Sequence, residues 1–157
     1  MALSIRSRRS VVVWITISWL LKQAGAELPK SESALRRNLG QPLAAVRRTY
    51  PDLAYAGYDE WLGNYWICNA SLGVYTRKGM VRAVLIRVPN LAIQGVAVGD
   101  SIDRAEVKLG EAETMRFAAC SGLGEQRTRP TLLGYPDRHL QILCGRNKVV
   151  GILLTNE

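Results

Sequence analysis

The only histidine of the chain, His139, lies close in sequence to Asp137 and Cys144, and these three residue types form the catalytic triad of some hydrolases. Such a triad needs its base within hydrogen-bonding distance of its nucleophile. Along an extended strand, however, His139 and Gln141 would face one side, whereas Leu140 and Cys144 would face the other. We therefore interpret His139 as an exposed residue near a turn, and we expect the protein not to be an enzyme.

Metal and nucleotide motifs are equally weak in this sequence. One histidine without a His-Glu-x-x-His segment does not form a typical zinc site. The segment Ser121-Gly122-Leu123-Gly124 is rich in glycine but lacks the Gly-Lys-Ser/Thr of a phosphate-binding loop, so it predicts a flexible loop instead. We expect no metal ion and no cofactor.

Aromatic side chains crowd the segment from Tyr50 to Trp66, where acids and glycines lie among them. Tyr and Trp in a polar loop are typical of the residues that dominate protein–protein interfaces. Ordinary burial preferences predict that Tyr50, Tyr65 and Trp66 pack inward beneath this loop. The residues that we predict to be exposed and to bind a partner are Tyr55, Tyr58, Asp59, Glu60 and Trp61.

In this interpretation the aromatic residues grip the partner, and Asp59 and Glu60 meet its basic groups. If the aromatic cluster is part of the core instead, the contact surface is expected on the sheet face or in the loop 122–129.

The first 26 residues predict an export signal. Three arginines among the first nine residues precede the apolar run 11–21, and Ala24-Gly25-Ala26 offers the small residues of a cleavage site. The apolar run has only about half of the ~20 residues that a bilayer requires, which argues against a membrane anchor. We expect cleavage after Ala26 and a periplasmic mature protein that does not span a membrane.

The charge of the mature chain is modest. Four of the 21 basic residues precede Glu27 and none of the 13 acidic residues does, so the net charge falls from +8 to +4. A balance of this size is not the basic footprint of a nucleic-acid-binding protein. We therefore expect another protein as the partner, and no nucleic acid.

Three cysteines follow the predicted signal: Cys68, Cys120 and Cys144. In an oxidising compartment two of them are expected to pair. Cys120 and Cys144 each end an apolar segment in the same half of the chain, so we favour a Cys120–Cys144 disulfide with Cys68 as a buried thiol. The sequence leaves a pairing that involves Cys68 open.

Two segments of the chain share one pattern, in which a glycine precedes a short amphipathic helix. Apolar residues recur at i, i+3 and i+7 in each helix and form one buried stripe. These residues are Leu43, Val46 and Tyr50 in the first helix and Ile102, Ala105 and Leu109 in the second. A shorter helix is predicted over 31–38, capped by Ser31 or Ser33.

The ends of the two halves also match. Segments 72–76 and 80–88, joined by a short turn, predict a β-hairpin, and so do segments 140–144 and 149–154. Each half therefore consists of a helix followed by strands that end in a hairpin. Pro89-Asn90 marks the junction between the halves.

Segments 98–101, 107–111 and 147–152 carry a family resemblance. They resemble the pattern G-[DMS]-[ST]-x-x-x-V-x-x-x-L-G-x-P, followed by strands that end in G-K-V-x-x-I, of small exported bacterial proteins. The fold is similar to that of the outer-membrane assembly lipoprotein family SmpA/OmlA and of the tandem-repeat β-lactamase inhibitor proteins. The resemblance covers most of 92–154 and, more faintly, 41–86. It implies a fold but no catalytic residues, and the lipidated cysteine of the assembly lipoproteins is lacking.

We therefore predict an α+β protein with a signal peptide over 1–26 and one domain of two tandem αβ repeats, 27–91 and 92–157. Its antiparallel sheet carries short helices on one face. The predicted function is that of a periplasmic module that binds and neutralises another protein, as an enzyme inhibitor or as an immunity protein against a periplasm-targeted toxin. The alternative is an envelope or outer-membrane assembly or structural factor.

Overall fold

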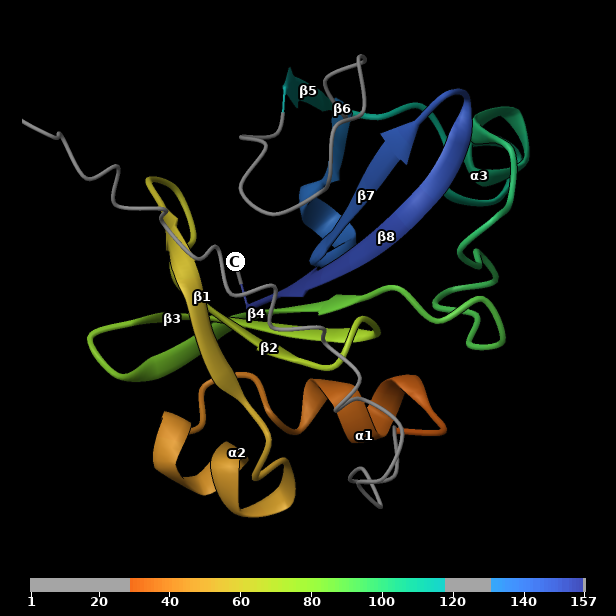
Figure 1. Ribbon diagram of the computed structural model, residues 1–157. Coiled ribbons are helices and arrows are strands. Elements are labelled where there is room, and N and C mark those ends of the chain that lie inside the picture. The colour runs from red at the N-terminus through yellow and green to blue at the C-terminus, as the bar shows by residue number, and fades with distance from the viewer. Residues whose placement is uncertain (1–28, 118–130, 157) are drawn as a thin grey trace, which may run out of the picture.

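The computed structural model describes residues 29–117 and 131–156 (Figure 1). The predicted signal peptide and the glycine-rich loop lie outside this part of the chain, and so does Cys120 with its predicted disulfide. Within the described part, no helix has the length and apolar character needed to cross a membrane.

Short helices and strands alternate along the described ranges. The helices are α1 (Glu32–Arg36), α2 (Leu43–Thr49) and α3 (Ile102–Leu109), with a 3-10 turn, η1, at Pro136–Arg138. The strands of the first half are β1 (Ala54–Asp59), β2 (Gly63–Cys68), β3 (Leu72–Arg77) and β4 (Met80–Ile86). Those of the second half are β5 (Thr114–Phe117), β6 (Thr131–Tyr135), β7 (Leu140–Gly145) and β8 (Lys148–Thr155).

All strands of the described part belong to one antiparallel sheet of eight strands, in the order β1-β2-β3-β4-β8-β7-β6-β5. Each half forms a meander of four strands. The last strands of the two halves, β4 and β8, pair in the centre, from Ala83 opposite Thr155 to Ile86 opposite Ile152. Strands β1 and β5 are consequently the two edges of the sheet.

The helices pack on one face of this sheet, as the sequence predicts. Leu35 of α1, Val46 of α2, and Ala105 and Leu109 of α3 are buried in one apolar cluster with alternate residues of the strands. Figure 1 shows α1 and α2 below strands β1–β4, and α3 beyond the turn between β7 and β8. The α+β class with helices on one face of an antiparallel sheet is therefore confirmed. We call the covered side the helix face.

Helix α2 begins directly on the sheet because the residues before it pair with the start of β4. Gly40 N donates to Val81 O (2.9 Å), Val81 N donates to Gln41 O (2.9 Å), and Leu43 N donates to Gly79 O (2.9 Å). These bonds fix the entry point of α2 beside the β3–β4 turn.

Helix α3 is attached to the other half in the same manner. Gly99 N donates to Val149 O (2.8 Å), Val149 N donates to Asp100 O (2.8 Å), and Ile102 N donates to Asn147 O (3.2 Å). The two predicted hairpins, β3–β4 and β7–β8, are both present, and each carries the start of one helix.

The opposite face of the sheet is apolar near its centre and carries two stacked tyrosines. The rings of Tyr65 and Tyr75 lie 4.6 Å apart and are inclined by 25°. Gly73 lies directly beneath Tyr65, where a Cβ atom would be 2.5 Å from Cε2 of that ring. The tyrosine ring thus occupies the space that the glycine leaves.

We expect Gly73→Ala to lower the free energy of unfolding by about 1–3 kcal/mol, because overpacking forces neighbouring side chains out of their preferred positions. Gly151→Ala, on the same face, is the matched control, since its Cβ atom would meet the flexible tip of Leu85 at 3.1 Å. Urea unfolding of both variants measures the difference. Equal losses would contradict the close packing of Tyr65 on Gly73.

Candidate functional site

The aromatic segment from Tyr50 to Trp66 is an edge hairpin rather than the predicted polar loop. Its residues form β1, a turn and β2, and β1 pairs with β2 alone among the described strands. The acids that suggested a loop have a simple place in this hairpin, because Asp59 ends β1 and Glu60 lies in the turn. An edge strand also tolerates exposed polar residues, since one side of it faces solvent.

Strand β1 contains a β-bulge that decides where its tyrosines point. Tyr55 pairs with Trp66 and Gly57 pairs with Tyr65, so one residue of β1, Ala56, is extra. In a regular strand, residues three positions apart face opposite sides. The extra residue brings Tyr55 and Tyr58 to the same side, because their partners on β2 are Trp66 and Asn64, two positions apart.

The exposures of the aromatic side chains agree with the prediction. Tyr55, Tyr58 and Trp61 are 57%, 59% and 70% exposed. Tyr50 and Tyr65 are buried, and Trp66 is half-buried against the helix-face core. Three large aromatic side chains of the predicted binding set are therefore at the surface.

Trp66 connects β1 to helix α2 on the helix face. Its ring meets that of Tyr55 edge-on, with centroids 5.4 Å apart and planes inclined by 71°. The guanidinium carbon of Arg47, on α2, lies 5.7 Å from the Trp66 centroid, within the range of a cation–π contact. Trp66 Nε1 donates to Thr76 Oγ1 (3.1 Å), a hydroxyl that is itself buried. Tyr55, Trp66 and Arg47 thus form a continuous row from the edge strand to the helix.

The turn that carries Trp61 is held from both sides. Asp59 Oδ1 accepts hydrogen bonds from Trp61 N (2.8 Å) and Leu62 N (2.9 Å). Arg77 Nη2, at the end of β3, donates to Glu60 O (3.2 Å) and Trp61 O (3.0 Å). Asp59 therefore shapes the turn, whereas the side chain of Glu60 is exposed. A turn fixed in this way loses little conformational entropy when Trp61 meets a partner.

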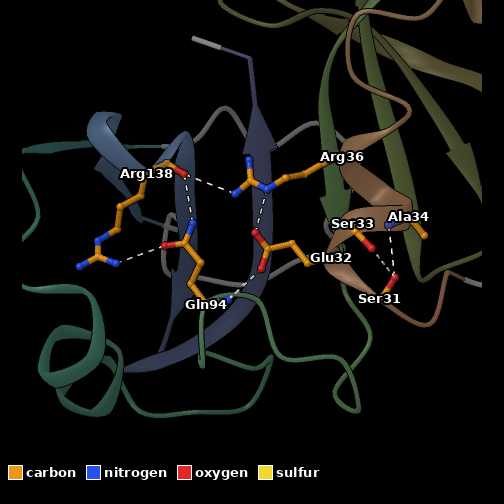
Figure 2. Close-up of polar contacts among 7 residues, drawn as sticks. All are labelled: Ser31, Glu32, Ser33, Ala34, Arg36, Gln94 and Arg138. Atoms are coloured by element: carbon orange, nitrogen blue, oxygen red, sulfur yellow. Dashed lines mark hydrogen bonds and ion pairs between the residues drawn. The ribbon is translucent and has the colours of Figure 1, made fainter.

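A polar network elsewhere ties the first half of the chain to the second (Figure 2). Glu32 Oε1 accepts from Arg36 Nε (2.7 Å) and Glu32 Oε2 accepts from Gln94 N (3.1 Å). Gln94 Nε2 and Arg36 Nη2 both donate to Arg138 O, at 3.1 and 3.4 Å. Both carboxylate oxygens of Glu32 are engaged, so this network joins α1, the junction segment and η1. We assign it a structural role.

The residues considered for a hydrolase triad lie in different environments. His139 is exposed and follows η1 with a left-handed backbone (φ 50°), whereas Cys144 is buried in the helix-face core. Burial raises the pKa of the Cys144 thiol to about 11, with a further contribution from Glu106. A thiol with so high a pKa stays protonated at neutral pH and is a poor nucleophile.

The other described cysteine, Cys68, is also buried, and it is not joined to Cys144. Burial raises the pKa of its thiol, and Asp52 contributes in the same direction. The predicted Cys120–Cys144 bond stays a prediction because Cys120 lies outside the described residues. Within residues 29–117 and 131–156, no group of three or more His, Cys, Asp or Glu side chains is arranged to hold a metal ion.

Comparison with known proteins finds a likeness in fold only. No protein-family model and no curated protein matches the chain. A solved structure with a similar fold is an extracellular protein containing an SCP domain from Bacillus anthracis str. Ames, with a TM-score of 0.51 and 8% sequence identity. The match covers 87% of this chain and 49% of that one, so this chain spans about half the length of its structural neighbour.

The exposure of Trp61 predicts that Trp61→Ala changes the free energy of unfolding by no more than about 0.5 kcal/mol, as substitutions at exposed sites usually do. Tyr65→Ala in the same hairpin should cost about 3 kcal/mol or more, because it removes a buried aromatic side chain. Thermal and urea unfolding of the two variants compare these values. A large loss of stability in Trp61→Ala would make Trp61 a core residue and remove it from the candidate site.

Proposed function

We propose that the protein is a binding module that neutralises another protein, as an enzyme inhibitor or as an immunity protein against a toxin. The observation that carries the proposal is the exposure of Tyr55, Tyr58 and Trp61 on an edge hairpin that is held in place by its own contacts. Tyr and Trp supply large contact areas with few rotatable bonds, and they are enriched among the residues that dominate binding energy.

The compartment is part of the same proposal. The charged start, the apolar run and the small residues that end at Ala26 are the sequence features that support export to the periplasm. A neutralising protein in that compartment would meet secreted enzymes or toxins delivered there.

We further propose that the chain is a tandem of two αβ repeats. Matching bridges support this: Pro42 pairs with Met80 before α2, and Ser101 pairs with Lys148 before α3. A helix followed by a four-stranded meander occurs twice, and the two meanders meet through their last strands. The β-lactamase inhibitor proteins that the sequence resembles have such a tandem arrangement, which is the reason for placing inhibition first.

An envelope or outer-membrane assembly factor is the second candidate. It is favoured by the resemblance of segments 98–101 and 107–111 to the assembly lipoproteins. The same edge hairpin would then contact an outer-membrane protein or another envelope component. The identity of the partner distinguishes the two candidates.

Site-specific photocrosslinking in the bacterium that produces the protein tests the proposed function. With p-benzoylphenylalanine in place of Tyr58, we expect one discrete adduct with another protein after irradiation. The same photocrosslinker in place of Val107, which is 86% exposed on α3, is the matched control and should give no such adduct.

Mass spectrometry of the adduct then decides between the candidates. A secreted enzyme or a toxin supports neutralisation, whereas an outer-membrane protein or assembly component supports the second candidate. If position 58 gives no adduct, or if positions 58 and 107 give the same adducts, the edge hairpin is not the binding surface.

A further inference from the structure

The aromatic edge of the sheet is bordered by unneutralised basic side chains. Arg47 and Arg48 occupy the last turn of α2, and both are exposed. Neither forms an ion pair with a carboxylate of the described residues. Arg47 also lies over Trp66, in the row that leads to Tyr55. We call the five residues Arg47, Arg48, Tyr55, Tyr58 and Trp61 the edge surface.

The charge of the chain is concentrated in the half that carries this surface. Residues 29–88 contain nine basic and four acidic residues, whereas residues 89–156 contain eight basic and seven acidic ones. The net charge is therefore +5 for residues 29–88 and +1 for residues 89–156. The excess positive charge belongs to the half that contains α2 and the edge hairpin.

The four acids of the first half, which are already counted in this net charge, lie in different surroundings. Glu32 pairs with Arg36 of its own helix, 2.7 Å away. Asp59 is engaged by the backbone of the β1–β2 turn. Only Asp52 and Glu60 are left as exposed carboxylates. None of these carboxylates forms an ion pair with Arg47 or Arg48, so these two guanidinium groups can be matched by a partner, beside the expected contacts of Asp59 and Glu60 with its basic groups.

We propose that the edge surface binds an acidic patch of a partner protein. Tyr55, Tyr58 and Trp61 pack against its apolar part, while Arg47 and Arg48 form charge-assisted hydrogen bonds to its carboxylates. The contact of Arg47 with Trp66 restricts its guanidinium before the partner arrives, which lowers the entropic cost of binding. This inference rests on the proposed function and adds the chemistry of the partner to it.

Aromatic and basic side chains together also suit an anionic membrane surface. The surroundings of the tyrosines favour a protein instead. The small residues Ala54 and Ala56 lie beside them on β1, and no Leu or Ile whose burial the structure describes is exposed to enter the acyl region. The other exposed large apolar side chains, Met80 and Val107, belong to other elements.

Charge-matched variants in the photocrosslinking assay test this inference. R47E/R48E should reduce the adduct formed from position 58 at least ~10-fold, a change equivalent to about 1.4 kcal/mol. R146E/K148E changes the net charge equally at the exposed β7–β8 turn and should leave the adduct within about twofold, because rim charges act locally. R47K/R48K keeps the positive charges and should retain most of the adduct.

Thermal unfolding shows whether each variant is folded. Because Arg47 contacts Trp66, R47E/R48E can disturb the fold. If the double variant does not fold, R48E alone takes its place. The crosslinked peptide of the partner should carry Asp or Glu residues. An adduct that survives R47E/R48E, or that is lost equally in R146E/K148E, overturns the acidic-partner inference but leaves the proposed function standing.

If photocrosslinking from position 58 gives no adduct, both proposals are wrong. Sedimentation with phosphatidylglycerol vesicles then identifies the alternative occupant. Vesicle binding that R47E/R48E abolishes and R146E/K148E preserves would assign the edge surface to a membrane instead of a protein.

Discussion

One extra residue in an edge strand determines the candidate binding surface of this protein. Ala56 has no partner of its own across the β1–β2 ladder, and the bulge that it forms shifts the register between Tyr55 and Gly57. Without the shift, Tyr55 and Tyr58 would point to opposite sides of the sheet. With it, both point to the helix face, where Trp66 and Arg47 already lie. Tyr55 and Tyr58 share the face that carries Trp66 and Arg47 only because of this register.

The rest of the fold supports that edge. The central pairing of β4 with β8 joins two four-stranded meanders into one sheet, and the helices bury the apolar side of each. Helix α2 is anchored where its preceding residues pair with the start of β4, so the position of Arg47 relative to β2 follows from backbone hydrogen bonds. The turn at the far end of β1 is fixed by Asp59 and Arg77.

Local patterns in the sequence predict the helices and the two hairpins well, because each depends on neighbours within a few residues. The stripe of Val46 and Tyr50, the cap at Ser31 and the pattern of the β3–β4 hairpin are signals of that kind. The predicted division between inward-packed and exposed aromatic residues also agrees with the structure.

Features that depend on pairing between distant segments could not be predicted in this way. The bulge at Ala56 exists only relative to β2, so the sequence predicts a loop where the structure has an edge hairpin. The bonds of Asp59 to the turn depend on the turn geometry, which the sequence does not reveal. The network of Glu32, Gln94 and Arg138 joins residues that are far apart in the sequence, and no spacing signal announces it.

The orientation of Tyr58 is the most direct test of this account, and nuclear Overhauser contacts in the purified protein measure it. The account predicts contacts between the side-chain protons of Tyr58 and Asn64, together with contacts between the rings of Tyr55 and Trp66. Contacts between the rings of Tyr58 and Tyr65 would place Tyr58 on the opposite face. That result would contradict the bulge and, with it, the shared surface of the two tyrosines.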